Sequence, residues 1–330
     1  MPEAHLVSTA AAIPSSVSVV VCTHTVARRQ ILGHLIDSIA AGTVKPVEVV
    51  VVVDRNRPLF EALTAATWPL SLRVIESRGS GLSAARNAGW QTVTSPLVAF
   101  IDDDAVATPG WLAELTNAAD RHGADVVGGA IEPLWNGDAP GWYSRYLGWV
   151  VGCSYEGLPR EAARVRNVIG CNMLFRRELL DRLEGFDTTL GRTNNGLAGC
   201  EETELCIRAN RAGAAVVLIP GAQVSQVLPA DRRRFRYAVR RGWDEGRSKR
   251  MLVAMHGRVL ATESSYARAL LRQALVWVGT GIVGRHASDI RRAAALIAVL
   301  TSTTASYLLH GLRRPTPRVV ARPPVTAING

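Results

Sequence analysis

Residues 97–105 read LVAFIDDDA, an apolar run that ends in three consecutive aspartates, Asp102, Asp103 and Asp104. A short apolar run bounded by polar residues is typical of a buried strand. The three carboxylates would then emerge at the C-terminal end of that strand, the edge of an open α/β sheet where ligands bind. This stretch therefore predicts both a sheet and a binding site.

Similar apolar runs alternate with amphipathic segments on both sides of this stretch. We expect strands at 17–22, 47–53, 72–77, 97–101, 125–129 and 215–220, and helices at 28–41, 58–66, 82–92 and 111–122, from Arg177 and near Glu201. This alternation predicts an α/β fold with a mainly parallel sheet flanked by helices. Between Ala130 and Arg166 it gives way to a long aromatic segment, and long irregular insertions in compact domains are often functional.

The composition limits the partners that the chain can have. Its 330 residues carry a net charge of +10 with 48% hydrophobic residues, which predicts a folded protein with anionic partners. No recognised RNA or DNA module accompanies the charge, so we expect no nucleic-acid partner. The N-terminal residues lack a positive start followed by an apolar stretch, so we expect the main domain to stay in the cytoplasm.

The C-terminal third differs from the rest of the chain. Residues 231–250 hold nine basic and three acidic side chains, and two apolar stretches follow at Ala274–Gly284 and Ala293–Leu309. With basic residues at their flanks, these stretches predict a helix pair lying on an anionic membrane surface. The alternative is an ordinary helical hairpin packed on the main domain.

Three adjacent carboxylates repel one another unless a divalent cation or basic side chains compensate them. Oxygen ligands suit Mg²⁺ or Mn²⁺, so we expect Asp102 and Asp104 to hold a metal in a DxD arrangement. A solvated acidic turn that caps the next helix would explain one aspartate better than three.

The glycine-containing segment RGSGLSAARNAG gives a rival interpretation. Gly79, Gly81 and Ala84 match a GxGxxA dinucleotide fingerprint, which would make the chain an NAD-dependent oxidoreductase. Such a fingerprint normally follows the first strand of its unit, where this chain has CTHTVARR. We therefore interpret the glycines as a tight turn before a helix, with Arg86 and Asn87 facing the ligand.

Seven motifs in one order resemble the family 2 glycosyltransferases: VSVVVCTHTVARRQIL, VEVVVVVDRN, GLSAARNAG, FIDDD, GCNMLFRRELL, GFDTTLG and CEETELCIRANRAG. The resemblance spans residues 17–220. It implies a GT-A fold, a Rossmann-like nucleotide-diphospho-sugar transferase domain, and inverting transfer from a nucleoside diphosphate sugar, with a UDP-sugar as the expected donor.

The resemblance also implies roles for individual residues. Thr23 and Asp54 would contact the nucleobase and ribose, and Arg28 would lie near the first loop. The remaining nucleotide-sugar contacts would come from Gly81, Arg86, Asn87, Asp102 and Asp103. His24, Thr25 and Arg55 depart from the residues that the family usually shows at these positions.

Inverting transfer needs a base that takes the proton of the acceptor hydroxyl. In CEETEL, Glu202 stands where the family usually has an aspartate, so the resemblance makes it the expected base and leaves Glu201 as a second candidate. Alternatively, both acids would only stabilise a helix N-terminus through its dipole.

The segments WYSRYLGWVVGCSYEGLP and WDEGRSK look like those of the bacterial and archaeal glucosyl-dolichyl-phosphate glucuronosyltransferases. This implies a polyprenyl-phosphate-linked or other glycan acceptor in cell envelope glycan biosynthesis. Guanidinium and aromatic groups suit such a ligand, so we expect Arg240, Arg241, Trp243 and Trp149 to bind it. A polyprenyl-phosphate sugar synthase and a binding module without activity remain alternatives.

We expect five parts in the chain. These are an N-terminal tail (1–16), the glycosyltransferase domain (17–228), a basic segment that faces acceptor and membrane (229–257), amphipathic and apolar helices (258–312), and a disordered tail (313–330).

Overall fold

The computed structural model describes residues 16–192 and 199–312. The expected tails lie outside this range, apart from Ser16. The strands are β1 (Val17–Thr23), β2 (Val49–Val53), β3 (Leu72–Glu76), β4 (Leu97–Asp102), β5 (Ala105–Ala107), β6 (Val126–Trp135), β7 (Ala163–Arg164), β8 (Asn172–Arg176) and β9 (Val216–Leu228). The α-helices are α1 (Arg29–Ala40), α2 (Arg57–Thr64), α3 (Leu82–Trp90), α4 (Trp111–Arg121), α5 (Arg177–Arg182), α6 (Glu201–Arg211), α7 (Phe235–His256), α8 (Ala261–Val283) and α9 (Ala287–Leu312). Short 3₁₀ helices span Val26–Arg28, Arg145–Val151 and Ala230–Arg233.

One mixed sheet of nine strands forms the centre of the fold, in the order β3-β2-β1-β4-β8-β6-β9-β5, with β7 paired to β9. The expectation of a mainly parallel sheet is right for β3, β2, β1 and β4 and for the pair of β6 and β9. It is wrong for β8, which runs antiparallel to both of its neighbours, and for β5 and β7, which run antiparallel to β9. The segment between β6 and β8 contains no crossover α-helix. Parallel strands need such a crossover, whereas antiparallel strands do not.

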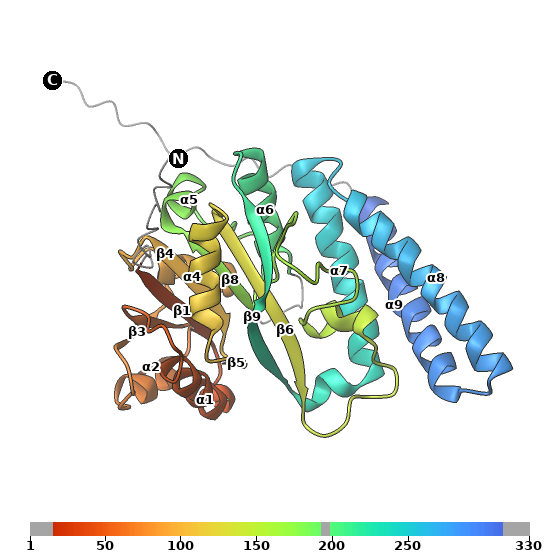
Figure 1. Cartoon of the computed structure of the whole chain (residues 1–330), viewed down its shortest axis with the longest axis horizontal. Coiled ribbons are helices and arrows are strands. Elements are labelled where there is room, and N and C mark those ends of the chain that lie inside the picture. The colour runs from red at the N-terminus through yellow and green to blue at the C-terminus, as the bar shows by residue number, and fades with distance from the viewer. Residues whose placement is uncertain (1–15, 193–198, 313–330) are drawn as a thin grey trace, which may run out of the picture.

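Helices cover both faces of the sheet (Figure 1). Alternate residues of a strand point to opposite faces, and the core divides accordingly. Val19 and Val21 pack in one cluster with α1 and α4, whereas Val20 packs in the other with α3, α5 and α6. The strands β1 and β2 are buried on both sides, which explains their uninterrupted valines.

The C-terminal third is helical, as expected, and lies beside the sheet (Figure 1). The helices α8 and α9 form an antiparallel hairpin, and α9 also packs along α7. Close approach of α7 and α9 depends on two glycines. A Cβ at Gly246 would lie 2.2 Å from the Thr303 carbonyl oxygen, and one at Gly242 would lie 2.9 Å from that of Val299.

One helix in the described part of the chain, Ala287–Gly311, is long and apolar enough to cross a membrane, with a mean hydropathy of 1.4. Only 28% of that stretch is buried within the protein. Length and composition alone are weak evidence for a span, because core helices of soluble proteins share them.

Candidate active site

Three parallel strands bring three predicted donor-binding residues to one edge of the sheet. Thr23 ends β1, Asp54 follows β2, and Asp102 ends β4. The register pairs Thr23 with Val53, and the Asp54 amide donates to the Thr23 carbonyl at 2.8 Å. The ends of these strands therefore meet where the sequence placed the site.

Arginines compensate the acidic stretch. Arg28 reaches Asp103 at 2.5 Å and Asp104 at 3.3 Å, and Arg232 lies 3.6 Å from Asp104. The Gln226 amide donates to Asp104 Oδ1 at 3.2 Å. Basic side chains, the alternative to a metal ion for compensating the three carboxylates, are thus present around Asp103 and Asp104. Arg232 belongs to the basic segment, and no sequence pattern linked it to this site.

Burial raises the pKa of Asp103 to about 6, while the Arg28 guanidinium opposes that rise and the Asp104 carboxylate adds to it. The pKa of Arg28 is raised as well, because the attraction of Asp103 and Asp104 outweighs the effect of burial, and for a base this favours the charged form. The two groups hold each other in their charged forms at neutral pH.

The carboxylates fit a divalent cation in part. Within the described residues, no cluster of three or more His, Cys, Asp or Glu side chains could hold a metal ion. Mg²⁺ is commonly held by one or two carboxylates together with substrate phosphates and water, which two aspartates could provide. Asp102 lines a cavity with its side chain 25% exposed. Asp104 does not line it, and its buried Oδ2 has no hydrogen bond but lies 3.3 Å from Arg28 and 3.6 Å from Arg232.

The glycine segment forms the tight turn that we expected before α3. Gly81 has a φ of 92°, which glycine adopts without strain, and its amide donates to Asp54 Oδ2 at 2.9 Å. The turn follows β3 rather than β1. It therefore lacks the position that a dinucleotide fingerprint takes after the first strand.

Arg86 joins the donor edge to the expected base. It is 3% exposed, and its guanidinium lies 2.8 Å from Glu201, 3.3 Å from Asp102 and 2.9 Å from the Gly170 carbonyl. Asn87 has a different place. Its side-chain amide donates to the Phe186 carbonyl and accepts from the Phe186 backbone amide. Asn87 therefore ties α3 to the segment that follows α5, and it does not line the cavity.

The two glutamates at the start of α6 differ in their surroundings. Both line the cavity, but Glu201 is 4% exposed and paired with Arg86, whereas Glu202 has no ion pair in the described part of the chain. Burial, reinforced by the nearby Glu201 carboxylate, raises the pKa of Glu202 to about 7. A carboxylate with this pKa suits general-base chemistry near neutral pH, which supports Glu202 over Glu201.

The cavity has a volume of about 410 Å³ and lies between the sheet edge and the C-terminal helices. Two of the four predicted acceptor residues line it. Arg241 lies over the ring of Trp149, with its guanidinium carbon 5.9 Å from the ring centroid. Arg240 and Trp243 are outside: the Arg240 side chain is 69% exposed, and Trp243 packs edge-on against His310.

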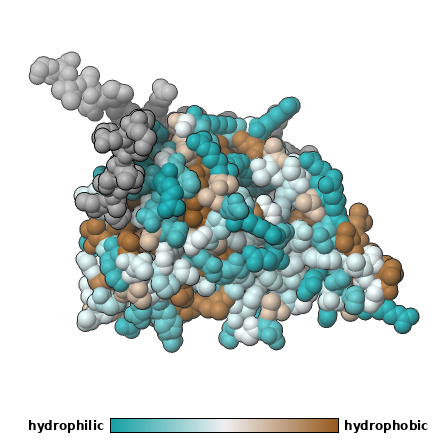
Figure 2. Space-filling model, in the orientation of Figure 1, coloured by the Kyte–Doolittle hydropathy of each residue, from teal (hydrophilic) through white to brown (hydrophobic). Residues whose placement is uncertain are grey.

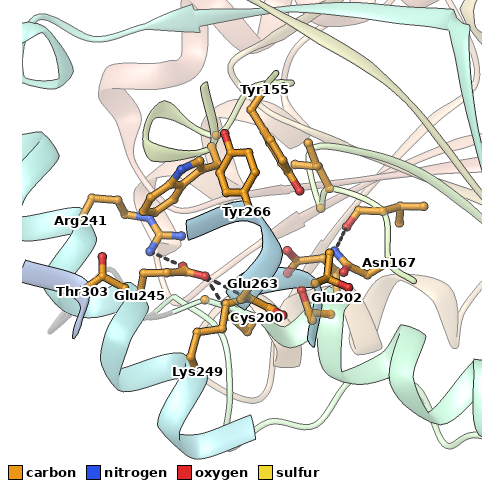
Figure 3. A pocket seen from close by; sticks show the side chains of 18 of the residues that line it. Tyr155, Asn167, Cys200, Glu202, Arg241, Glu245, Lys249, Glu263, Tyr266 and Thr303 are labelled. Atoms are coloured by element: carbon orange, nitrogen blue, oxygen red, sulfur yellow. Dashed lines mark hydrogen bonds and ion pairs between the residues drawn. The ribbon is translucent and has the colours of Figure 1, made fainter. Parts of the chain in front are cut away.

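Several lining residues were not predicted from sequence. Figure 3 shows Glu245 and Lys249 on the same helix as Arg241, with Tyr155 and Tyr266 above them. The spacing of 241, 245 and 249 places these side chains on one helix face, so this signal was available. Glu263 and Tyr266 lie on α8, and no motif connected α8 to the site.

Comparison with known proteins agrees with this geometry. The family model described as Glycosyl transferase family 2 matches residues 18–184. Glucosyl-dolichyl phosphate glucuronosyltransferase of Haloferax volcanii is 30% identical over 259 residues, which cover 77% of this chain and 83% of the relative. Succinoglycan biosynthesis protein ExoM of Rhizobium meliloti is 27% identical over 88% of this chain and 91% of its own length.

A solved structure shares the fold. The crystal structure of GalNAc-T7 with UDP, GalNAc and Mn²⁺ matches 66% of this chain and 44% of that chain, with a TM-score of 0.51 and 17% identity. The expected GT-A fold with a helical extension is confirmed. The family match also argues against the alternative interpretation of the chain as an NAD-dependent oxidoreductase. The chain therefore belongs to glycosyl transferase family 2.

Proposed function

We propose that this glycosyltransferase moves a sugar, with inversion, from a UDP-sugar to a hydroxyl of a lipid-linked or other glycan acceptor. The observation that carries the proposal is that Asp102, Arg86 and Glu202 line one cavity. Donor-binding and base chemistry would then meet in a single space. The name of the Haloferax relative supports a lipid-linked glycan acceptor, and the UDP and Mn²⁺ of the structural neighbour support the donor class and a metal.

In the proposed reaction Glu202 takes the proton of the acceptor hydroxyl. The hydroxyl oxygen forms a bond to the anomeric carbon while the bond between that carbon and the diphosphate oxygen breaks. The diphosphate leaves with the electron pair, and the proton stays on Glu202 until solvent removes it. A pKa of about 7 allows Glu202 both to accept and to release this proton near neutral pH.

Thr23, Asp54 and the Gly81 turn would bind the nucleoside, because they lie together at the ends of β1 and β2 and the start of α3. Arg28 and Asp103 would border the nucleotide from the first loop and the acidic stretch. Asp102 and Asp104 would hold Mn²⁺ or Mg²⁺, which supplies Lewis-acid stabilisation of the leaving diphosphate when bound.

Calorimetry with UDP-, GDP- and dTDP-sugars, in Mn²⁺ and then in EDTA, tests the donor and the metal together. We expect one nucleotide class to bind, and EDTA to weaken that binding by about tenfold or more, because the diphosphate loses its counter-charge. Asp104→Ala should reproduce the EDTA effect while the fold is retained. Asp37→Ala, an exposed carboxylate on α1, is the control. Full metal-dependent affinity in Asp104→Ala would reject the metal assignment.

We also propose that the outer end of the α8 and α9 hairpin contacts the cytoplasmic face of an anionic membrane. Figure 2 shows apolar side chains gathered at this end, where Ile282 is 68% and Val283 is 88% exposed. Arg285, between the two helices, and Arg291 and Arg292, on α9, add positive charge close by. Apolar groups bordered by arginines are typical of interfacial membrane contacts.

Vesicle co-sedimentation tests this contact. We expect the protein to bind vesicles that contain anionic lipid and to be released by salt, because Arg residues supply part of the attraction. The double variant Ile282→Asp, Val283→Asp should lose most of this binding. Val47→Asp changes a residue of similar exposure, 58%, on the glycosyltransferase domain and should bind like the wild type. Equal binding by all three proteins would contradict the assignment.

A further inference from the structure

Among residues 16–192 and 199–312, the side chains that line the cavity carry no surplus of positive charge. Five basic residues line it: Arg86, Arg166, Arg192, Arg241 and Lys249. Five acidic residues line it as well: Asp102, Glu201, Glu202, Glu245 and Glu263. With every group ionised the two sets are equal in number, so the summed charge of these walls is zero.

The cations on the side of the C-terminal helices are already bound to carboxylates. Arg241 lies 2.7 Å from Glu245, and Lys249 lies 3.1 Å from Glu245 and 2.9 Å from Glu263. Arg166 holds both oxygens of Glu263, at 2.6 and 2.7 Å. These five residues form one chain of ion pairs, part of which Figure 3 shows.

The two carboxylates of this chain are held in their charged form. Lys249 and Arg241 lower the pKa of Glu245 to about 2 against the opposing effect of burial. A phosphate entering here would compete for Arg241 and Lys249 with the Glu245 carboxylate, whose side chain is only 13% exposed. Breaking such a largely buried ion pair costs free energy. Arg192 is the lining cation without a carboxylate partner in residues 16–192 and 199–312, and it lies beside α3 at the donor side, where its carbonyl accepts from the Leu82 amide.

Aromatic rings make up another part of the wall. Trp149 and Tyr155 come from the aromatic segment, and Tyr266 comes from α8. The Tyr155 and Tyr266 rings lie 5.1 Å apart, and all three residues are only partly buried. The Tyr266 hydroxyl donates to the Tyr146 carbonyl at 2.6 Å, which fixes its ring. Partly exposed aromatic rings combine apolar contact area with little conformational freedom, which suits them to bind a flat apolar face.

We infer that Trp149, Tyr155 and Tyr266 form a subsite for an uncharged sugar, the reacting unit of the acceptor, and that this cavity does not take a bare lipid phosphate. The inference rests on the proposed function, because it assigns the acceptor side of the same site. A pyranose ring offers an apolar face to the aromatic groups and hydroxyls to the carboxylates of the wall. One of those hydroxyls would meet Glu202, a base that an already ionised phosphate acceptor would not need.

The inference can be tested by comparing ligands that share an octyl tail and differ only in carrying a sugar or a phosphate group. Calorimetry on the full chain with UDP would compare octyl glycosides of glucose, galactose and mannose with octyl phosphate. We expect at least one glycoside to bind about tenfold more tightly than octyl phosphate. Octyl phosphate binding as tightly as the best glycoside, or no binding of any octyl compound, would overturn the inference.

Variants test the residues of the subsite. Tyr155→Ala should weaken glycoside binding about five- to twentyfold through loss of ring contact, with little change for octyl phosphate, and Tyr155→Phe should bind like the wild type. Glu245→Gln should strengthen octyl phosphate binding, because it releases Arg241 and Lys249 from a carboxylate. Equal effects of Tyr155→Ala on both heads, or no gain for octyl phosphate in Glu245→Gln, would contradict the charge and ring arguments.

The proposed function has its own readout, which is binding and slow hydrolysis of the nucleotide sugar without any acceptor. If these occur and the glycoside results fail, the subsite is wrong and the glycosyltransferase mechanism remains. If the nucleotide sugar neither binds nor reacts, the proposed function is wrong, whatever the octyl glycosides do.

Discussion

Glu202→Gln should lower sugar transfer by about 10²- to 10⁴-fold, which is the usual contribution of a general base. The amide keeps the size of the side chain but cannot accept the proton of the acceptor hydroxyl. In the wild type, kcat/KM should rise with pH and level off above about 7, because only the ionised form of Glu202 acts as a base. The variant should lose this dependence. Donor affinity should remain, because Glu202 makes no ion pair to the residues of the donor edge.

The same substitution should stabilise the fold at alkaline pH. The pKa of Glu202 rises from the ordinary 4.5 to about 7 on folding, so the folded protein holds this proton more tightly than the unfolded chain. The ionised carboxylate therefore destabilises the fold increasingly between pH 4.5 and 7 and fully above pH 7. Removing it should add about 1–3 kcal/mol at pH 8 and nothing at pH 4.

Denaturant unfolding at pH 4 and pH 8, alongside transfer assays, measures both effects. Glu178→Gln changes an exposed glutamate on α5 and should alter neither activity nor stability. If Glu202→Gln keeps full activity, Glu202 is not the base. If activity falls in Glu201→Gln and not in Glu202→Gln, the second candidate replaces it.

Arg86→Met should destabilise the protein by about 3–5 kcal/mol and abolish measurable transfer. The guanidinium is buried between Glu201 and Asp102, and its removal leaves two carboxylates without their counter-charge. Asp102 would also lose the group that orients it toward the cavity. Methionine retains most of the apolar stem, so lost packing contributes little.

A double-variant cycle separates the charge effect from other damage. Arg86→Met combined with Glu201→Gln should be more stable than the sum of the single changes predicts, because the amide no longer needs a cation. Urea unfolding of the four proteins measures this coupling. Arg121→Met, at the exposed end of α4, serves as the control. Additive effects, or a loss below about 1 kcal/mol for Arg86→Met, would mean that Arg86 does not hold the site together.

The sequence determined the first half of the sheet and its binding edge. The valine runs at 17–22 and 47–53 and the run at 97–101 predict buried strands, and the structure has strands there. Parallel strands bring their C-terminal ends together, so the strand expected at 97–101 places Asp102 at this edge, where Thr23 and Asp54, expected in the site from the family resemblance, also lie. The helix expected near Glu201 is also present, because α6 begins at that residue.

Only the tertiary structure decided which side chains surround these residues. Sequence gave no sign that Arg232 would reach Asp104, or that Glu263 and Tyr266 of α8 would close the cavity around Glu202. The antiparallel direction of β8 was equally hidden, because the segment between β6 and β8 carries no periodic pattern. Local periodicity fixes the type and facing of each element. Contacts between segments far apart in the sequence depend on the relative positions of the packed helices, which a local sequence pattern does not determine.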